Sequence, residues 1–260
     1  MAVVRSSSEE MGSLFVVSTP IGNLGDVTHR SIETLNSVSL IAAEDTRRTR
    51  ILLNRYQINT PLSSYNSFNK IKKGKEFITR LKKGNNLALV SDAGTPGISD
   101  PHYYLVNAAI EEGCPIYSIP GPSALLAALT VSGLPMDRFI FEGFLPRKKG
   151  RTTTLENLSH EKRTIVLFES PNRIQKTLQD LYRFFGNRKI AIAREMTKLY
   201  EEVVRGNLKE LSDQTRTWKG EITVVIAGSN EKKKDKITYS INPKEANRPI
   251  VGDTIGQGLG

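Results

Sequence analysis

The chain has 260 residues, of which 38% are hydrophobic and 25% charged, a balance typical of a globular protein with a sizeable core. Its one cysteine, Cys114, excludes intramolecular disulfides, and its three histidines argue against a histidine-rich site, so we expect no metal. The formal net charge of +10 favours a polyanionic partner, with nucleic acid first. No apolar run approaches membrane-spanning length, so we expect no membrane partner and a cytoplasmic location.

Strands and helices alternate through the first half of the sequence. The polar, serine-rich residues 1–13 read as a disordered leader. Short apolar runs then predict strands over residues 14–18, 39–43, 62–65, 87–90 and 115–119. Helices are predicted over residues 29–37, with Thr28 as N-cap, and over 69–83 and 103–112. Two further helices are predicted in the arginine-rich segment that ends at residue 56 and after Ser123. This alternation favours a mostly parallel sheet.

The second half is predicted to be a mixed α/β domain. Strands are expected over residues 139–144, 164–168, 189–193, 200–205 and 221–227, and helices over 171–185 and 207–218. Because residues 200–204 and 221–227 could pair antiparallel, we expect a mixed sheet. The predicted fold class is therefore α/β with two domains, residues 14–121 and 122–228. A lysine run begins the segment 229–260, which we expect to be a basic, disordered tail.

A loop rich in glycine and acids follows the predicted strand 87–90. It reads SDAGTPGISDP (residues 91–101), and Gly94 and Gly97 permit backbone angles that are closed to other residues. In open α/β sheets, ligands bind outside the carboxyl ends of strands, where this loop is expected. An ordinary turn in which Asp100 caps the next helix explains the same residues, because the loop matches no known phosphate-binding spacing.

Several motifs, taken together and in order, resemble those of the bacterial 16S rRNA (cytidine) 2′-O-methyltransferases, which share the tetrapyrrole-methylase fold. They are STPIGNLGD (18–26), EDTRRT (44–49), SDAGTPGISDP (91–101), IPGPSA (119–124), FESPNR (168–173), ARE-T (193–197) and KGE (219–221). Where tetrapyrrole enzymes carry a glycine-rich GxGPGD-like loop, this chain has PIGNLGD. The segment after Gly228 does not resemble the small helical domain that often ends the family's members, which leaves the mode of rRNA docking open.

The resemblance implies two α/β domains that bind S-adenosylmethionine in the cleft between them, usually as a homodimer. It implies methylation of a ribose 2′-hydroxyl of a cytidine in the decoding region of 16S rRNA within the 30S subunit. The cofactor-binding residues that it suggests are Pro20, Asp92, Gly94, Ile98, Ser99, Asp100, Ser123, Ala124, Leu167, Phe168, Ala193 and Glu221.

A ribose hydroxyl is a poor acid, so an acidic side chain near the strand ends would assist the transfer. The candidates are Glu44, Asp45, Asp26, Asp92 and Glu195. We expect Glu44 or Asp45 to orient the 2′-hydroxyl while a neighbouring arginine holds the adjacent phosphate. Acids that merely complement the dipole of a helix N-terminus would account equally well for both positions.

RNA contacts are expected from Arg47, Arg48, Arg50, Arg147, Lys148, Lys149 and Arg151. The basic residues within 70–83 are better explained as a solvated helix face. Tyr65 and Phe68 could stack a splayed base, although core packing suits Phe68 as well. Two other functions stay open from the residues alone: a methyltransferase of the same fold that acts on a tetrapyrrole, and a non-enzymatic RNA-binding module.

Overall fold

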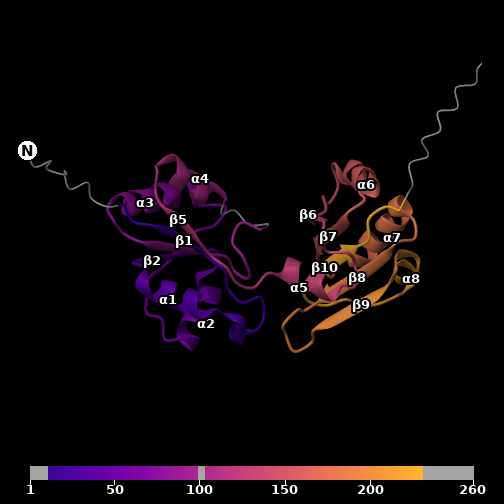
Figure 1. Ribbon diagram of the computed structural model, residues 1–260, viewed down its shortest axis with the longest axis horizontal. Helices are drawn as coiled ribbons and strands as arrows, with labels where there is room; N and C mark the ends of the chain where they lie inside the picture. The colour runs from indigo at the N-terminus through magenta and orange to yellow at the C-terminus, as the bar shows by residue number, and fades with distance from the viewer. Residues whose placement is uncertain (1–10, 99–102, 231–260) are drawn as a thin grey trace, which may run out of the picture. The chain divides into compact units, whose positions relative to one another are not determined.

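The computed structural model describes residues 11–98 and 103–230. Its first sheet has five parallel strands in the order β3-β2-β4-β1-β5 (Figure 1). Their bounds are Leu14–Val17 (β1), Leu40–Ala43 (β2), Leu62–Ser64 (β3), Leu87–Val90 (β4) and Ile116–Ile119 (β5). The five apolar runs in the first half therefore form the predicted parallel sheet.

Helices cover both faces of this sheet (Figure 1). On one face lie α1 (His29–Ser37) and α2 (Thr46–Arg55), and on the other lie α3 (Lys70–Lys82) and α4 (Tyr103–Glu111). Side chains alternate between the two cores, so that Ala42 packs with α3 and α4 while Ile41 and Ala43 pack with α1 and α2. Burial on both faces explains why β2 and β4, whose residues are all buried, are continuous apolar runs.

The second sheet is mixed, with strand order β6-β7-β10-β8-β9. Its strands are Phe139–Phe144 (β6), Thr164–Glu169 (β7), Lys189–Arg194 (β8), Glu202–Asn207 (β9) and Ile222–Ile226 (β10). Only β6 and β7 pair in parallel, and the other neighbours are antiparallel. The predicted mixed sheet is confirmed, and both sheets belong to one compact unit of the chain.

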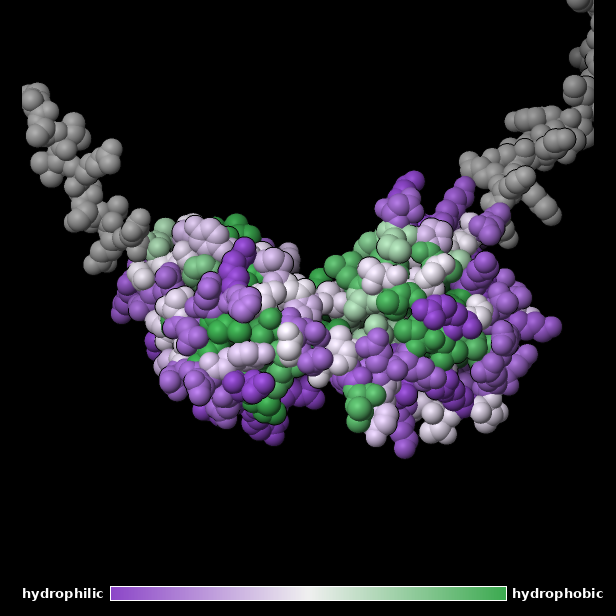
Figure 2. Space-filling model, turned by 60° about the horizontal axis from the view of Figure 1, so that its bottom comes forward, coloured by the Kyte–Doolittle hydropathy of each residue, from purple (hydrophilic) through white to green (hydrophobic). Residues whose placement is uncertain are grey.

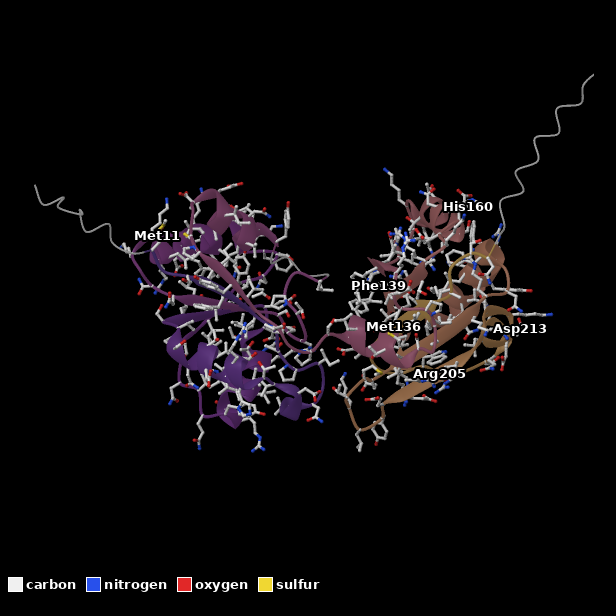
Figure 3. All side chains as sticks on the ribbon, viewed as in Figure 1. Met11, Met136, Phe139, His160, Arg205 and Asp213 are labelled. Carbon is white, nitrogen blue, oxygen red and sulfur yellow. The ribbon has the colours of Figure 1, made fainter. Side chains whose placement is uncertain are left out.

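One face of the second sheet packs against α6 (Arg151–Ser159), α7 (Ile174–Phe185) and α8 (Leu208–Asp213), and the other against α5 (Ala124–Val131). Ser123 occupies the predicted N-cap position of α5 but makes no capping hydrogen bond. The edge strand β9 is joined to α5 by Arg205, labelled in Figure 3, whose Nε donates to the Val131 carbonyl oxygen at 3.1 Å.

Two predictions for the second half are wrong. The strand over β9 pairs with β8, not with β10, because β10 is buried along its whole length and takes the centre of the sheet. The helix predicted over residues 207–218 ends at Asp213, where Gln214 is extended. Trp218 is buried beyond the helix, with the Arg216 guanidinium 4.3 Å from its ring centre.

The predicted leader and tail fall largely outside the described residues, and the division into domains at residue 121 stays a prediction. Cys114 is 5% exposed and packs in the core of the first sheet, as expected for a small buried residue. Burial raises the pKa of its thiol. Among the described residues, no helix is long and apolar enough to cross a membrane.

Candidate active site

The first sheet has a topological switch point between β1 and β4. The two strands are neighbours, but the chain leaves β1 toward β2 and leaves β4 toward β5, in opposite directions along the sheet. The connecting helices α1 and α4 lie on opposite faces of the sheet. Such a reversal opens a crevice at the carboxyl ends of the strands, where α/β proteins bind ligands. The loops that start with residues 18 and 91 both begin at this crevice.

Neutral hydrogen bonds join the loops at the switch point. Thr19 and Gly94 exchange two backbone hydrogen bonds of 2.9 Å each. The Thr95 hydroxyl lies 3.1 Å from the hydroxyl of Ser18 and donates to the carbonyl oxygen of Pro122 at 3.3 Å. The loops after β1, β4 and β5 are thus fixed to one another.

Gly94 has a φ of +80°, a conformation that favours glycine, and a Cβ there would lie 3.2 Å from Ile21 Cγ2. Both its backbone polar groups are engaged by Thr19, so the need for glycine arises from the contact between the two loops.

A cavity of about 330 Å³ opens beside these loops, a volume within the usual range for small-molecule sites. Its wall is mostly apolar, with polar groups on Thr95, Ser123, Ser170, Glu221 and Thr223. The complete lining is Ile21, Ala93, Gly94, Thr95, Ile98, Ser123, Ala124, Phe144, Phe168, Glu169, Ser170, Pro171, Ala193, Met196, Gly220, Glu221, Ile222 and Thr223. Both sheets contribute residues to this wall.

The structure brings many of the predicted cofactor-binding residues to this cavity. They are Gly94, Ile98, Ser123, Ala124, Phe168, Ala193 and Glu221. Ser99 and Asp100 lie outside the described residues. Among the described residues, the predicted Pro20, Asp92 and Leu167 are not part of the wall.

Two of these exceptions, Leu167 and Asp92, have physical reasons. Leu167 is 1% exposed and points into the core beneath α6 and α7, because its neighbour Phe168 takes the opposite face of β7. Asp92 accepts the backbone N–H of Asp45 at 2.8 Å and lies 3.8 Å from Arg48 Nε. Asp92 therefore joins the loop after β4 to the start of α2 instead of facing the cavity.

Several lining residues of the second sheet were not predicted, chiefly Glu169–Pro171 and the start of β10. Ile222 pairs with Glu169 and Thr223 with Phe168 across the antiparallel β7–β10 ladder, which carries the start of β10 to the end of β7. An antiparallel β7–β10 pairing would have identified these positions, but the sequence suggested a different partner for β10.

Charged side chains hold the second-sheet part of the wall. Lys198 Nζ donates to Glu195 Oε1 at 2.8 Å and to Glu221 Oε2 at 3.0 Å. The hydrogen bond from Lys198 holds the pKa of Glu195 below its usual value, against the opposing effect of burial. Burial alone would lower the pKa of Lys198, but its two carboxylate partners outweigh burial and raise it.

The same charged group packs against the first sheet's loops. A Cβ on Gly22 would lie 2.4 Å from Lys198 Cγ, and a Cβ on Gly220 would lie 2.3 Å from Glu195 Cδ. Glycine at both positions therefore allows the loops after β1, β8 and before β10 to meet.

The acids proposed for catalysis, Glu44 and Asp45, are not part of the cavity wall. Asp45 is the N-cap of α2, accepting the Arg47 backbone N–H at 2.9 Å, and its carboxylate also receives Arg47 Nε and Nη2 at 3.0 and 2.7 Å. The Arg47 side chain, then its backbone N–H, lowers the pKa of Asp45 to about 2. The capping explanation thus accounts for Asp45, and a catalytic role of Glu44 or Asp45 stays a prediction.

The predicted RNA contacts differ in exposure. Arg47, Arg48 and Arg50 on α2 and Arg147, Lys148 and Lys149 after β6 are exposed. Figure 2 shows hydrophilic side chains over much of the visible face. Arg151 is only 9% exposed, and its Nε, Nη1 and Nη2 donate to Asp180, Pro146 O and Thr177. Arg151 is therefore closed to the open surface, and an RNA contact there stays a prediction.

The two aromatic side chains proposed for base stacking also differ. Tyr65 is completely buried against Phe77, with ring centres 5.7 Å apart, so the stacking prediction is wrong for it. Burial raises the pKa of Tyr65 to about 12. Phe68 is fully exposed and is free of the core packing considered for it.

Residues 13–212 match the sequence model of a family described as Tetrapyrrole (Corrin/Porphyrin) Methylases. This match covers more than half of the chain, and the protein belongs to that family. Within it, the chain is 52% identical over 220 residues to Ribosomal RNA small subunit methyltransferase I of Thermotoga maritima, covering 84% of this chain and 99% of the relative. The proteins of the same name from Bacillus subtilis and Escherichia coli O157:H7 are 45% and 42% identical, each covering 89% of this chain and 80% and 83% of the relatives.

Solved structures share the fold at low sequence identity. The cobalt precorrin-4 methyltransferase CbiF superimposes with a TM-score of 0.63 at 16% identity, covering 87% of this chain and 98% of that one. A diphthine synthase gives a TM-score of 0.64 at 16% identity, covering 83% and 89%. These likenesses confirm the predicted fold class.

Proposed function

We propose that this protein methylates the ribose 2′-hydroxyl of a cytidine in the decoding region of 16S rRNA, using S-adenosylmethionine. The observation that carries the proposal is the 52% identity with a ribosomal RNA small subunit methyltransferase over 99% of that protein's length. The formal net charge of +10 agrees with a polyanionic substrate.

The cavity at the switch point suits the cofactor. Apolar side chains such as Phe144, Phe168 and Met196 offer surfaces for an adenine ring, while Thr95, Ser123 and Glu221 supply polar partners for a ribose and an amino-acid group. Bound S-adenosylmethionine supplies an electrophilic methyl group on its sulfonium. The residues of the two sheets hold it, keep water from the methyl group and fix its orientation.

The end of β2 and the start of α2 are proposed to receive the ribose. With its pKa lowered to about 2, Asp45 stays ionised at neutral pH and can accept a hydrogen bond from the 2′-hydroxyl. Arg48 and Arg50 are exposed on the same helix and would contact neighbouring phosphates, as would Lys148 and Lys149 after β6. Phe68 offers an open ring on which a base can stack.

The substrate would be the assembled 30S subunit, and the protein would act in the cytoplasm, where that particle is found. A homodimer is proposed from the resemblance alone. Light scattering of the purified chain tests the dimer, and a monomer at working concentrations would refute it.

The activity test is transfer of a labelled methyl group to 30S subunits, followed by a mass map of ribose methylation. We expect one methylated cytidine in the decoding region, and more product on 30S subunits than on naked 16S rRNA. Equal rates on the two RNAs would refute the preference for the particle.

Two control arms address the other functions. Methyl transfer to a porphyrinoid with none to 30S subunits would replace the proposal by a tetrapyrrole methyltransferase. Calorimetry that detects no heat with S-adenosylmethionine, while RNA still binds, would identify a non-enzymatic RNA-binding module.

A further inference from the structure

A second cavity, of about 400 Å³, lies next to the first and is lined largely by cations. Its positive side chains are Arg147 from the loop after β6, Arg151 at the start of α6, and Arg173 and Lys176 at the start of α7. Ser170, Asn172 and Thr177 complete the wall with hydroxyl and amide groups. Such a lining suits an oxyanion that accepts several hydrogen bonds.

Two of the cations, Arg151 and Arg173, pair with acids that lie outside the wall of this cavity. Arg151 Nε donates to Asp180 at 2.9 Å, and Arg173 Nε lies 3.3 Å from Glu169. The Arg173 Nη2 also donates to the Leu145 carbonyl oxygen at 2.7 Å. Neither Asp180 nor Glu169 lines the second cavity, so their pairing fixes the geometry of both guanidinium groups while the positive charge still faces the second cavity.

The other two cations, Arg147 and Lys176, lie at the solvent-exposed edge of the cavity. Arg147 and Lys176 are exposed, and within residues 11–98 and 103–230 neither side chain makes an ion pair or a hydrogen bond. The cations of this cavity therefore outnumber Glu169 and Asp180, the acids that pair with them. The start of α7 adds to this field, because its first turn has no acidic residue and its N-cap makes no side-chain hydrogen bond.

A single turn separates this cavity from the proposed cofactor site. Ser170 lines both cavities, Pro171 lines the first, and Asn172 and Arg173 line the second. A group bound in the second cavity would thus lie next to the first cavity, where the methyl donor is proposed to bind.

We propose that the second cavity binds a backbone phosphate of the RNA substrate, next to the ribose that is methylated. This inference rests on the proposed function and assigns Arg173 and Lys176 to substrate binding together with Arg147. Arg151, closed off from the open surface, contributes charge to the wall. By fixing one phosphate, the cavity would set which 2′-hydroxyl reaches the methyl group.

The test compares two double variants that each remove two exposed cations. Arg147→Ala with Lys176→Ala removes the two exposed cations of the second cavity. Lys72→Ala with Lys75→Ala removes the same charge from the exposed face of α3. Each is assayed for methylation of 30S subunits at several salt concentrations, and for S-adenosylmethionine binding by calorimetry.

For the cavity variant we expect KM for 30S subunits to rise about tenfold or more and the salt slope of binding to fall by about one unit, as for one lost phosphate contact. Its affinity for S-adenosylmethionine should stay within about twofold of wild type, as should all values of the α3 variant. A third variant, Arg147→Lys with Lys176→Arg, keeps both charges and should recover most of the lost KM effect.

Cavity and α3 variants that behave alike toward 30S subunits, at any salt concentration, would overturn the phosphate site while leaving the proposed function intact. Loss of S-adenosylmethionine binding in the cavity variant would overturn it too, because the cavity would then serve the cofactor. If the wild-type protein itself methylates no RNA, the proposed function fails and this inference fails with it.

Discussion

The loops on the two sides of the cofactor cavity are fixed by different forces. In the first sheet, Thr19, Gly94 and Thr95 connect their loops through neutral hydrogen bonds between backbone and hydroxyl groups. In the second sheet, the turn after β7 depends on the carboxylate of Glu169, and the loop after β8 depends on Lys198 and its acidic partners.

This difference separates the responses of the two sides to pH and salt. Neutral hydrogen bonds do not titrate at ordinary pH, whereas carboxylates with a lowered pKa lose their contribution as they become protonated. We therefore expect the first-sheet loops to respond to steric changes and the second-sheet loops to respond to charge.

The largest effect is expected for Glu169→Ala. The Glu169 side chain is 1% exposed, accepts the Ser170 N–H and the Thr177 hydroxyl at 2.8 and 2.7 Å, and pairs with Arg173. Removing it leaves these donors unpaired in the interior, which should cost about 3 kcal/mol of unfolding free energy in urea denaturation.

The matched control is Glu76→Ala on α3. Glu76 also pairs with two cations, Lys73 at 2.8 Å and Arg80 at 3.5 Å, but its side chain is 41% exposed. Such surface pairs contribute about 1 kcal/mol or less. Equal losses in the two variants would show that the buried carboxylate does not organise the second-sheet wall.

The next effect is steric and belongs to the first sheet. Gly94→Val places a β-branched residue at a φ of +80° against Ile21, so the exchange with Thr19 should break and S-adenosylmethionine binding should be lost in calorimetry. Gly133→Val is the control, because Gly133 has a φ of +74° and a Cβ added there would meet nothing within 4 Å.

Both glycine variants should lose about 1–3 kcal/mol of stability from backbone strain, and only Gly94→Val should lose the cofactor. Unchanged cofactor affinity in Gly94→Val would falsify the assignment of this loop to the cofactor site.

The first sheet could be predicted from sequence because most of its strands are short apolar runs followed by a recognisable helix start. Thr28, for example, caps α1 as expected, accepting the Ser31 N–H at 3.1 Å. Local signals of this kind are enough when strands are parallel and both faces are covered.

The second sheet could be predicted only in part, because antiparallel partners are chosen by tertiary packing. Leu208, Leu211 and Trp218 are spaced like one face of a helix, but only the first two belong to α8, and Trp218 is buried after the chain has become extended. Leu167 and Phe168 show the same limit at the site: both are apolar, and only the sheet decides which one faces the cavity.

A smaller effect, dependent on pH, is expected for Lys198→Met. In the folded protein the pKa of Glu195 lies below its usual 4.5, so its stabilising contribution is present above that value and is lost as the pH falls through the lower folded pKa. Without Lys198, the pKa of Glu195 rises and acid unfolding should begin at a higher pH, with about 1 kcal/mol lost near neutrality. Melting temperatures measured from about pH 3 to pH 7 test this.

Thr95→Val is the neutral counterpart in the first sheet. It removes the hydrogen bonds to Ser18 and Pro122, which should cost about 1 kcal/mol at every pH in the same series. If the two variants showed the same pH profile, the distinction between a neutral and a charged side of the cavity would be wrong.

The smallest effect on stability is expected for Arg47→Ala, because Arg47 is 89% exposed and its ion pair with Asp45 lies at the surface. Its readout is electrostatic: the pKa of Asp45, lowered to about 2 chiefly by the Arg47 side chain, should rise in a carboxyl NMR titration. It should stay below the usual 3.8, because the backbone N–H of residue 47 still donates to the carboxylate. Arg50→Ala, on the same helix, should leave this titration unchanged.

Arg47→Ala also tests whether the start of α2 receives the substrate. The salt slope of RNA binding should fall by about one unit while S-adenosylmethionine affinity stays the same, because Arg47 lies outside the cavity wall. Loss of S-adenosylmethionine affinity instead would show that Arg47 contributes to cofactor binding in the first cavity. An unchanged salt slope with a raised pKa at Asp45 would restrict Arg47 to the helix cap, and the ribose would then have to be oriented from the charged second-sheet side.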